Sequence, residues 1–417
     1  MTESRFAVII VGAGVAGCSA ALLLARAGIN TLLLERGSEA GSKNVSGGRL
    51  YTHALAHMVP EFAASAPLER QISQEKLSLL SSDSAVTLDY RHPTPVSYSL
   101  LRARFDAWLM AQAQAAGAHC LTGVQVDQLL LQQGRVVGVQ VAGEALLADC
   151  VMVAEGANSL LTEQAGLQPK PAANTMAIGV KEVLALAPER LEERFSLEGN
   201  QGCAWLFAGA ATQGKIGGGF LYTNRQSLSL GVVCHLSELA DSRVALPQML
   251  QQFKQHPTIR PLIKQSELCE YSAHLLPEGG LASVPKLVGN GYLLLGDCAR
   301  FCVNRGYTVR GMDLAMLSAQ AAAETVIAGR PLADYPQRLQ QSTLWAVMQR
   351  YRRLPQIMLR SPHWFNRYPQ LAAKVLNEMF CGDQQPPSAL YQLLWRHARQ
   401  IGLKQLVKDT FNGMRNL

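Results

Sequence analysis

The first long hydrophobic stretch of the chain, residues 6–25, contains no charged residue. A glycine-rich turn at residues 12–17 divides it into a β-branched run, Ala7–Val11, and a run rich in alanine and leucine, Cys18–Ala27. The first run is typical of a buried strand and the second of a helix. Because the turn interrupts the stretch, and the acid and the base just before it cancel, neither a membrane span nor a signal peptide is predicted. The pattern predicts a strand, a tight turn and a helix.

Further hydrophobic runs predict an α/β core around this unit, then a β-rich region and a helical C-terminal part. Core strands are expected at residues 31–34, 121–131, 136–141, 146–153 and 292–295, with a late helix at about 311–329. The β-rich region is expected to contain a hairpin, 217–222 with 227–234, and a helix at 246–253. The C-terminal helices are expected at 339–351, 371–380 and 390–406, with prolines between them.

Composition and charge change this picture in one respect. With 417 residues, 48% of them hydrophobic and 17% charged, the chain is expected to form two or three packed domains. Its net charge of +7 is uneven, because residues 331–417 hold twelve basic and four acidic residues and the remainder is nearly neutral. A basic tail that also carries Trp345, Trp364 and Trp395 predicts an acidic protein partner or a membrane surface. The alternative is a packed helical subdomain with a solvated basic face, and no motif accompanies the charge that would predict nucleic-acid binding.

The glycine turn predicts a dinucleotide site. Gly12 permits the tight turn, Gly14 lets the backbone approach a pyrophosphate, and Gly17 lets the helix pack close to the strand. The helix N-terminus then presents unpaired N–H groups and a positive dipole end to the phosphates. The next strand ends in Glu35, where an acid accepts hydrogen bonds from the adenosine ribose. An acid at this position also disfavours a 2′-phosphate.

The return of the chain to this sheet favours FAD over NAD. The strand at 146–153 leads into Glu155-Gly156, and the strand at 292–295 leads into Gly296-Asp297. A late carboxylate after a strand suits a hydrogen bond from a ribityl hydroxyl, with the glycine leaving room for the cofactor. A single N-terminal Rossmann unit for NAD does not need this return.

Three longer strings carry a resemblance to a known family: residues 43–51 (KNVSGGRLY), 274–280 (HLLPEGG) and 296–313 (GDCARFCVNRGYTVRGMD). Together with the N-terminal fingerprint they resemble the FixC-like branch of the electron-transfer flavoprotein:quinone oxidoreductases, within the glutathione-reductase structural class. The resemblance implies an α/β fold with a Rossmann-like FAD-binding domain at 1–160 and 275–330, which carries a partial cap insertion at about 50–100. It also implies a β-rich cap or substrate domain at 161–274 and the basic helical region at 331–417.

The resemblance and the motifs together assign the FAD-binding residues. They are Gly12, Gly14, Ala16, Gly17, Glu35, Arg36, Ser46, Gly47, Gly48, Arg102, Val126, Glu155, Gly156, Gly296, Asp297, Asn304, Gly306, Gly311 and Met312. The N-terminus of the helix at Gly311 is implied to face the pyrimidine side of the isoalloxazine, where its dipole stabilises reduced flavin. Arg305 or Arg310 can add to this stabilisation, and the alternative for each is a surface salt bridge. Arg104 competes with Arg102 for the cofactor, and Gly47-Gly48 can be an ordinary turn.

The residues predict no side chain that performs catalysis. The nine cysteines are scattered without a CxxC pair, which predicts reduced thiols in a cytosolic protein and no metal or iron–sulfur site. No second GxGxxG and no Ser/His/Asp ordering is found, and the nine histidines are isolated. The hypothesis is that flavin performs the chemistry as an electron relay. The resemblance implies an electron-transfer flavoprotein as donor and a ferredoxin-like small protein or quinone as acceptor, in the cytoplasm or peripheral on the inner face of the cell membrane.

Two other functions remain open at this point. One is an FAD-dependent reductase or monooxygenase, similar to geranylgeranyl reductases, that acts on an apolar small molecule. The other is a non-catalytic FAD-bound assembly subunit. Reduction by NAD(P)H alone distinguishes the first of these, and a flavin that no donor reduces distinguishes the second.

Overall fold

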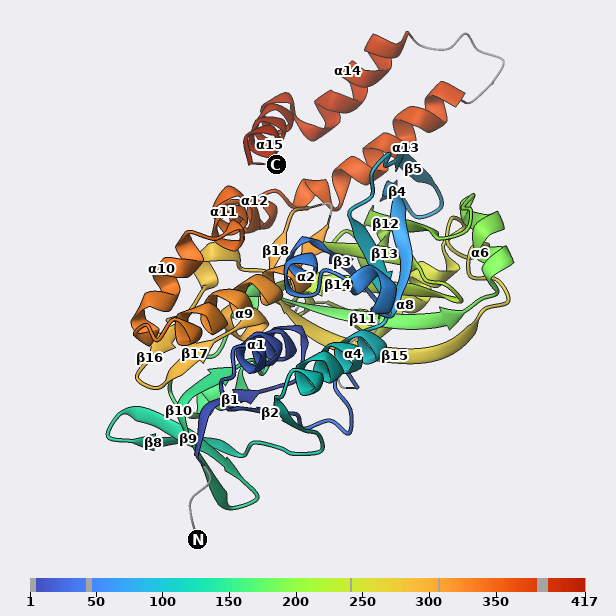
Figure 1. Cartoon of the computed structure of the whole chain (residues 1–417). Helices are drawn as coiled ribbons and strands as arrows, with labels where there is room; N and C mark the ends of the chain where they lie inside the picture. Colours follow the sequence, from blue (N-terminus) through green and yellow to red (C-terminus); the bar gives the residue numbers. More distant parts are fainter. Residues whose placement is uncertain (1–4, 43–46, 241, 307, 381–388, 417) are drawn as a thin grey trace.

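The computed structural model describes residues 5–42, 47–240, 242–306, 308–380 and 389–416. It shows two large sheets, a two-stranded ribbon and a helical C-terminal region (Figure 1). The ribbon joins β18 (Val303–Asn304) to β19 (Val309–Arg310). Both large sheets combine strands that are far apart in the sequence.

The first sheet is the predicted α/β core. In spatial order its strands are β16 (Val288–Gly289), β17 (Tyr292–Leu294), β10 (Glu144–Val153), β1 (Arg5–Val11), β2 (Thr31–Leu34) and β7 (His119–Leu121), with β9 (Arg135–Val141) and β8 (Gln128–Gln132) attached beside β10. The run from β17 to β7 is parallel, whereas β16, β9 and β8 pair in antiparallel fashion. Because parallel strands end at one edge, the loops after β1, β2, β10 and β17 meet there.

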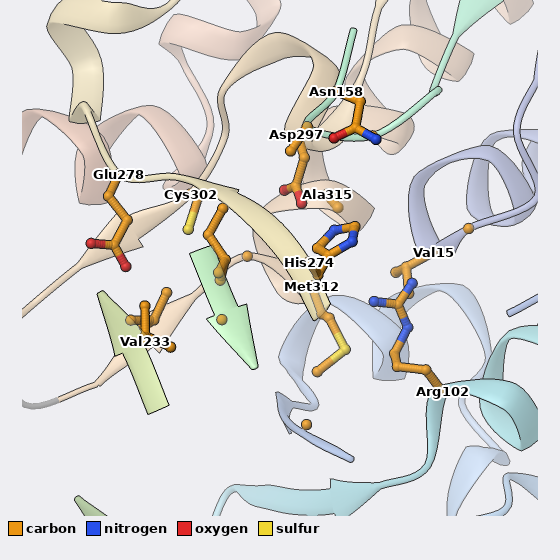
Figure 2. Close-up of a pocket in the computed structure, with 18 of the residues that line it drawn as sticks. Val15, Arg102, Asn158, Val233, His274, Glu278, Asp297, Cys302, Met312 and Ala315 are labelled. Atoms are coloured by element: carbon orange, nitrogen blue, oxygen red, sulfur yellow. The ribbon is translucent and has the colours of Figure 1, made fainter. Parts of the chain in front are cut away.

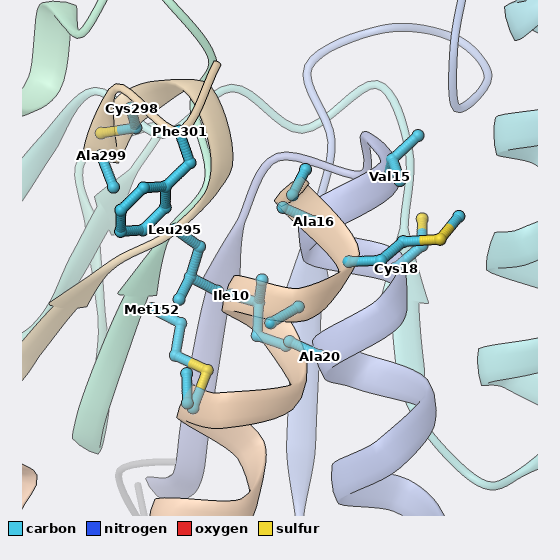
Figure 3. Packing of buried hydrophobic residues seen from close by; sticks show 14 of the residues in the cluster. Ile10, Val15, Ala16, Cys18, Ala20, Met152, Leu295, Cys298, Ala299 and Phe301 are labelled. Atoms are coloured by element: carbon cyan, nitrogen blue, oxygen red, sulfur yellow. The ribbon is translucent and has the colours of Figure 1, made fainter. Parts of the chain in front are cut away.

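Three helices pack with this sheet: α1 (Val15–Arg26), α4 (Arg102–Ala115) and α9 (Met312–Ile327). The contact between α1 and α9 is close because both helices are rich in alanine along their buried positions. Figure 3 shows Ala16 and Ala20 of α1 near Ile10 of β1 and Leu295, within one cluster. Ile10 and Leu295 are fully buried, and each such side chain stabilises the fold by about 1.5–3 kcal/mol.

The second sheet contains strands from two separate parts of the chain. In spatial order they are β15 (Glu267–Pro277), β11 (Met176–Ala185), β14 (Ser227–His235), β13 (Gly217–Thr223), β12 (Gln201–Gly209), β4 (Leu68–Leu80), β6 (Ser97–Leu100) and β3 (Gly48–Tyr51), with β5 (Ala85–Arg91) beside β4. The predicted hairpin is confirmed as β13 and β14. The parallel pair β4 and β12 joins the two parts of the sequence.

Short helices lie in the connections of both sheets. They are α2 (His53–Met58), α3 (Phe62–Ser65), α5 (Leu160–Gln164), α6 (Pro188–Phe195), α7 (Leu236–Leu239) and α8 (Leu246–Gln255). Turns of 3₁₀ helix occur at Ala173–Thr175, Ala210–Thr212, Gly280–Ser283, Gly296–Ala299, Leu332–Asp334 and Pro362–Trp364. Helix α8 covers the second sheet, and its Phe253 packs edge-on against Phe207 of β12 with ring centroids 5.1 Å apart.

The C-terminal region consists of α10 (Tyr335–Gln340), α11 (Thr343–Arg350), α12 (Leu354–Arg360), α13 (Arg367–Phe380), α14 (Leu390–Ile401) and α15 (Leu403–Asn416). Tyr335 anchors its start, because its buried hydroxyl donates a hydrogen bond of 3.0 Å to the carbonyl of Leu294. Helix α13 packs on β4, β5 and β12, whereas α14 and α15 lie farther from the sheets (Figure 1). Within the described part of the chain, no helix has both the length and the apolarity needed to cross a bilayer.

Three predicted elements were wrong in their extent. The strand at 121–131 is two short strands, because residues 122–127 leave the sheet and the N–H of Val124 bonds to the carbonyl of Glu35. The helix at 339–351 is divided into α10 and α11 by Ser342, which has an extended backbone. The helix at 390–406 ends at Gly402, whose φ of +94° does not fit a helix. Helix α12 was not predicted.

Candidate FAD and electron-transfer site

A cavity of about 750 Å³ is lined by loops at the edge of the first sheet and by strands of the second. Part of its lining, which we call the apolar wall, consists of Leu77, Leu206, Met358 and Phe365. The last two residues come from the C-terminal region. The tail therefore completes the cavity as well as carrying positive charge.

Charged and polar side chains occupy different parts of this cavity (Figure 2). Figure 2 shows Arg102 on one side, Glu278 and Cys302 on the opposite side, and His274 and Asp297 between them. The groups contributed by the first sheet's loops and by the second sheet's strands thus meet around a single space.

The glycine turn has the geometry that the sequence predicts. Gly12 has φ of +99°, and a Cβ there would lie 2.5 Å from the carbonyl oxygen of Ala154. A Cβ at Gly17 would overlap the carbonyl oxygen of Gly12, so this glycine lets α1 pack close to β1. Gly14 is the N-cap of α1, and Gly14 and Ala16 line the cavity, whereas Gly17 does not. The N-terminus of α1 therefore opens onto the cavity, as a phosphate site requires.

Glu35 lies at the end of β2 and lines the cavity together with Arg36 and Val126. Its carboxylate accepts a hydrogen bond of 2.9 Å from the N–H of Ala13 and one of 2.7 Å from the N–H of Gly37. These bonds hold the carboxylate beside the glycine turn. Each oxygen keeps a further lone pair for a ribose hydroxyl.

The structure distinguishes between the two arginines at the start of α4. Arg102 lines the cavity and donates hydrogen bonds of 2.8 and 2.7 Å to the two carboxylate oxygens of Asp106. Asp106 is fully buried. Arg104 points away, with 71% of its side chain exposed, and its nearest acid is Glu69 at 3.8 Å. Only Arg102 is placed to contact a ligand in the cavity.

Asp297 lines the cavity in the 3₁₀ turn after β17. Burial raises its pKa to about 6, although the charges of Arg102 and Arg300 act in the opposite direction. Arg300 is itself buried and donates hydrogen bonds of 3.0 Å to the carbonyl of Ala157 and to Oγ of Ser159. Gly296 does not line the cavity. A Cβ there would meet Ala16 of α1 at 3.0 Å, so this glycine leaves room for the helix and the predicted reason was wrong.

Glu155 and Gly156 both line the cavity, but the Glu155 carboxylate is occupied by the protein. It accepts hydrogen bonds of 2.8 and 3.0 Å from the N–H groups of Leu161 and Thr162, and one from the Thr162 hydroxyl. Glu155 therefore caps α5, and its backbone is the part that is free to face a cofactor.

The N-terminus of α9 also opens onto the cavity, through its N-cap Gly311 and first residue Met312. Asn304 and Gly306 line the cavity as well. Arg305 and Arg310 do not. The Arg310 guanidinium forms an ion pair with Asp313 of α9 and lies 4.7 Å from the centre of the Tyr51 ring.

Gly47 and Gly48 line the cavity at the start of β3, whereas Ser46 lies outside the described residues. Gly47 has φ of +74°, and a Cβ there would overlap Oγ of Ser229 in β14. Its carbonyl accepts a hydrogen bond from Nζ of Lys181. The segment is thus held against the second sheet and is more than an isolated turn.

The ionisable residues of the cavity that sequence reasoning missed include Lys181, His274 and Glu278. Burial lowers the pKa of Lys181 to about 7, with the charge of Arg102 adding to the effect and Glu270 opposing it. Burial also lowers the pKa of His274 to about 4. Lys181 could have been found from the sequence, because Lys181 and Glu182 are the two charges within the otherwise apolar stretch 176–187.

Comparisons with known proteins agree with this geometry. A family model described as FAD dependent oxidoreductase matches residues 7–96, a second described as ETF-QO, ubiquinone-binding matches residues 176–276, and a third described as ETF-QO/FixC family C-terminal domain matches residues 354–417. The chain is 49% identical over 426 residues to the probable electron transfer flavoprotein-quinone oxidoreductase YdiS of Escherichia coli K12, and 47% identical over 427 residues to FixC of the same strain, with 99% of both chains covered in each case. The chain belongs to the ETF-QO/FixC family.

Solved structures with the same fold are more distant in sequence. A geranylgeranyl bacteriochlorophyll reductase-like protein from Thermoplasma acidophilum superposes with a TM-score of 0.71 at 18% identity, covering 97% of this chain and 98% of the other. The flavin-dependent brominase Bmp2 has a TM-score of 0.62 at 16% identity, covering 96% of this chain and 100% of the other. These likenesses confirm the predicted α/β flavoprotein fold.

As a member of the ETF-QO/FixC family, the chain is an FAD-dependent oxidoreductase. The cavity fits FAD on two observations besides the family. The glycine turn and two helix N-termini open onto it, and it contains a buried carboxyl oxygen, Oε1 of Glu278, that no protein group satisfies. The turn and Arg102 would hold the pyrophosphate, and Glu35 the adenosine ribose. When bound, FAD supplies two-electron chemistry that the side chains do not.

Proposed function

We propose that this protein relays electrons from an electron-transfer flavoprotein through its FAD to a ferredoxin-like small protein or to quinone. The observation that carries this proposal is the full-length similarity to FixC and YdiS, across the FAD loops, the second sheet and the tail. The match of residues 176–276 to the ubiquinone-binding model supports quinone as an acceptor. The apolar wall, which suits a quinone head group and tail, gives the same support.

In this function the chain's own residues bind and orient the cofactor and set the electrostatic potential around it. The N-terminus of α9 places positive potential at the cavity, and Lys181 adds to it in its protonated form; both favour a cofactor that gains negative charge. The apolar wall offers no hydrogen-bonding side chain on that part of the cavity. No side chain needs to act as a nucleophile for an electron relay.

The first prediction tests the donor. Purified protein with bound FAD, mixed anaerobically with a reduced electron-transfer flavoprotein, is expected to lose its oxidised flavin absorbance, because electrons pass to the FAD. Addition of NADPH alone is expected to leave that absorbance unchanged. The measurement is a stopped-flow spectrum of each mixture.

A different spectrum would favour another function. The fold shared with the geranylgeranyl reductase-like protein and the apolar wall would suit a reductase acting on an apolar small molecule. Rapid bleaching by NADPH, with none by the flavoprotein, would support that reductase and contradict the relay.

The second prediction concerns the basic tail. Arg350, Arg352 and Arg353 are exposed around the junction of α11 and α12, and the latter helix also supplies Met358 to the cavity. If an acidic partner docks here, replacing all three with alanine slows electron transfer by about tenfold at low salt and removes most of its salt dependence. The FAD content is expected to stay unchanged, and stopped-flow rates over a range of ionic strength provide the measurement.

A membrane is the other candidate for contact with the tail. Helices α13 to α15 expose large apolar side chains beside their basic residues, including Phe380 at 81% exposure, Tyr391 at 71% and Phe411 at 63%. Vesicles of anionic phospholipid separate the two cases. Unchanged transfer rates in the triple variant, together with weaker sedimentation with such vesicles, would assign these arginines to a membrane instead of a protein.

A further inference from the structure

The electron relay leaves one buried acid of the cavity without a role. Glu278 follows β15, within the HLLPEGG string, and is only 5% exposed. Its Oε2 accepts a hydrogen bond of 3.0 Å from Nδ2 of Asn304. Its Oε1 is buried and has no hydrogen-bond partner. A buried carboxyl oxygen in this situation is costly unless it carries a proton or meets a ligand.

The surroundings of Glu278 do not stabilise a negative charge. The titratable group nearest to it on the cavity lining is the thiol of Cys302, before β18. The thiol of Cys234, in β14, also responds to its charge, from within the core of the second sheet. Burial raises the pKa of both thiols, so they are neutral near pH 7. Elsewhere on the cavity lining are Asp297, Lys181 and His274. Burial raises the pKa of Glu278 itself to about 7, and the bond from Asn304 opposes this only in part.

Glu278 stands next to residues expected to contact the flavin ring. Asn304, which bonds to it, also accepts a hydrogen bond of 2.8 Å from the N–H of Gly306 through its Oδ1. Both of these residues line the cavity with Gly311 and Met312 at the start of α9. Figure 2 shows Glu278 beside Cys302, on the side of the cavity opposite Arg102.

We propose that Glu278 is the redox-linked proton acceptor of the cavity, and that it takes up a proton when two electrons enter the bound FAD. This inference rests on the proposed function for its physiological setting. Added negative charge in a low-dielectric cavity raises the pKa of a nearby carboxylate, so an ionised Glu278 gains a proton from solvent. Two electrons and one proton then go to the cofactor, and one further proton goes to Glu278 wherever it was ionised before reduction.

The consequence depends on pH in a definite direction. Below about pH 7 Glu278 is already protonated in the oxidised protein, and reduction adds no proton to it. Above that pH the oxidised protein holds a carboxylate, and reduction protonates it up to the higher pKa that the added negative charge gives the group. Proton uptake per electron pair is therefore expected to rise above about pH 7.

The test is a redox-difference infrared spectrum of the FAD-loaded protein at about pH 8, with reduction by light and a chemical donor so that no protein partner is needed. The wild type is expected to gain a protonated carboxyl C=O band on reduction. Glu278→Gln, which keeps an acceptor for Asn304, is expected to lose the band. Glu278→Asp is expected to retain it at a shifted frequency, and Glu324→Gln, an acid of α9 that is 41% exposed, to retain it unchanged.

Glu278 can be distinguished from the other titratable groups of the cavity, and the pH dependence of thermal stability provides a second readout. Asp297 and Lys181 also titrate, but lysine has no carboxyl band, and an Asp297 band would survive Glu278→Gln. The folded pKa of Glu278 lies above its ordinary value of 4.5. The wild type is therefore expected to lose thermal stability as the pH rises from 4.5 to about 7, and Glu278→Gln is expected to lose less. A band that persists in Glu278→Gln, or its absence from the wild type, overturns the proposal. Neither result depends on whether an electron-transfer flavoprotein is the donor.

Discussion

Gly17→Ala is expected to abolish FAD binding and to lower the free energy of unfolding by about 3 kcal/mol or more. The added Cβ would overlap the carbonyl oxygen of Gly12, which is backbone and cannot rotate away. Helix α1 would have to move from β1, and its N-terminus would move with it. Helix propensity alone predicts that alanine raises the free energy of unfolding by about 1 kcal/mol. The sign of the measured change therefore shows whether the steric overlap or the helix propensity dominates.

The measurements are urea unfolding of the apoprotein and FAD content after purification. Gly28→Ala is the matched control, because a Cβ there meets no atom within 4 Å at the other end of α1. Its φ of +74° costs about 1 kcal/mol, but FAD binding is expected to survive. A stable, FAD-loaded Gly17→Ala protein would contradict the close approach of α1 to β1.

Arg102→Leu is expected to have the second large effect, because it changes stability and cofactor affinity together. Asp106 would lose both hydrogen bonds from the guanidinium while staying fully buried, and breaking such a buried pair typically costs about 3–5 kcal/mol. Loss of a charged donor at the cavity is expected to weaken FAD by about ten- to a hundredfold. Chemical unfolding and fluorescence titration with FAD measure the two effects.

The double variant Arg102→Leu with Asp106→Leu separates the loss of stability from the loss of FAD affinity. Removing the carboxylate is expected to restore most of the stability, while the weakened FAD affinity persists. Arg104→Leu is the control, since that side chain is 71% exposed and its pair with Glu69 spans 3.8 Å, a geometry worth under about 1 kcal/mol. Equal loss of FAD in the Arg102 and Arg104 variants would show that neither arginine binds the cofactor directly.

Local sequence was enough for the elements whose signal is local. The strand, turn and helix of residues 5–26 follow from β-branched residues, three glycines and an alanine-rich run, and the structure reproduces them. The break of the tail helices at Ser342 and Gly402 was missed because the hydrophobic period continues across both residues. The irregular path of residues 122–127 was missed because it depends on a hydrogen bond to the backbone of Glu35, which follows β2 and is distant in the sequence.

Some ionisable residues of the cavity can likewise be found from local sequence, whereas others cannot. Glu35 is found from its position after a strand, because a Rossmann unit fixes the distance along the chain. Lys181 and Glu278 are not found this way, since Lys181 lies in β11 and Glu278 directly after β15, and each meets the FAD loops only after folding. Their altered pKa values come from burial, which no spacing of residues specifies.

The sequence by itself determined the glycine turn with its acid, the late Gly296-Asp297 element, the resemblance to the ETF-QO/FixC family and the basic tail. The tertiary structure decided that Arg102 and not Arg104 faces the cavity, that Gly296 makes room for α1, and that Met358 and Phe365 of the tail complete the apolar wall. The physical reason is the distance along the chain over which each interaction acts. Turn geometry and hydrophobic period act between neighbours in the chain, whereas burial and the pairing of charges depend on segments that only the fold brings together.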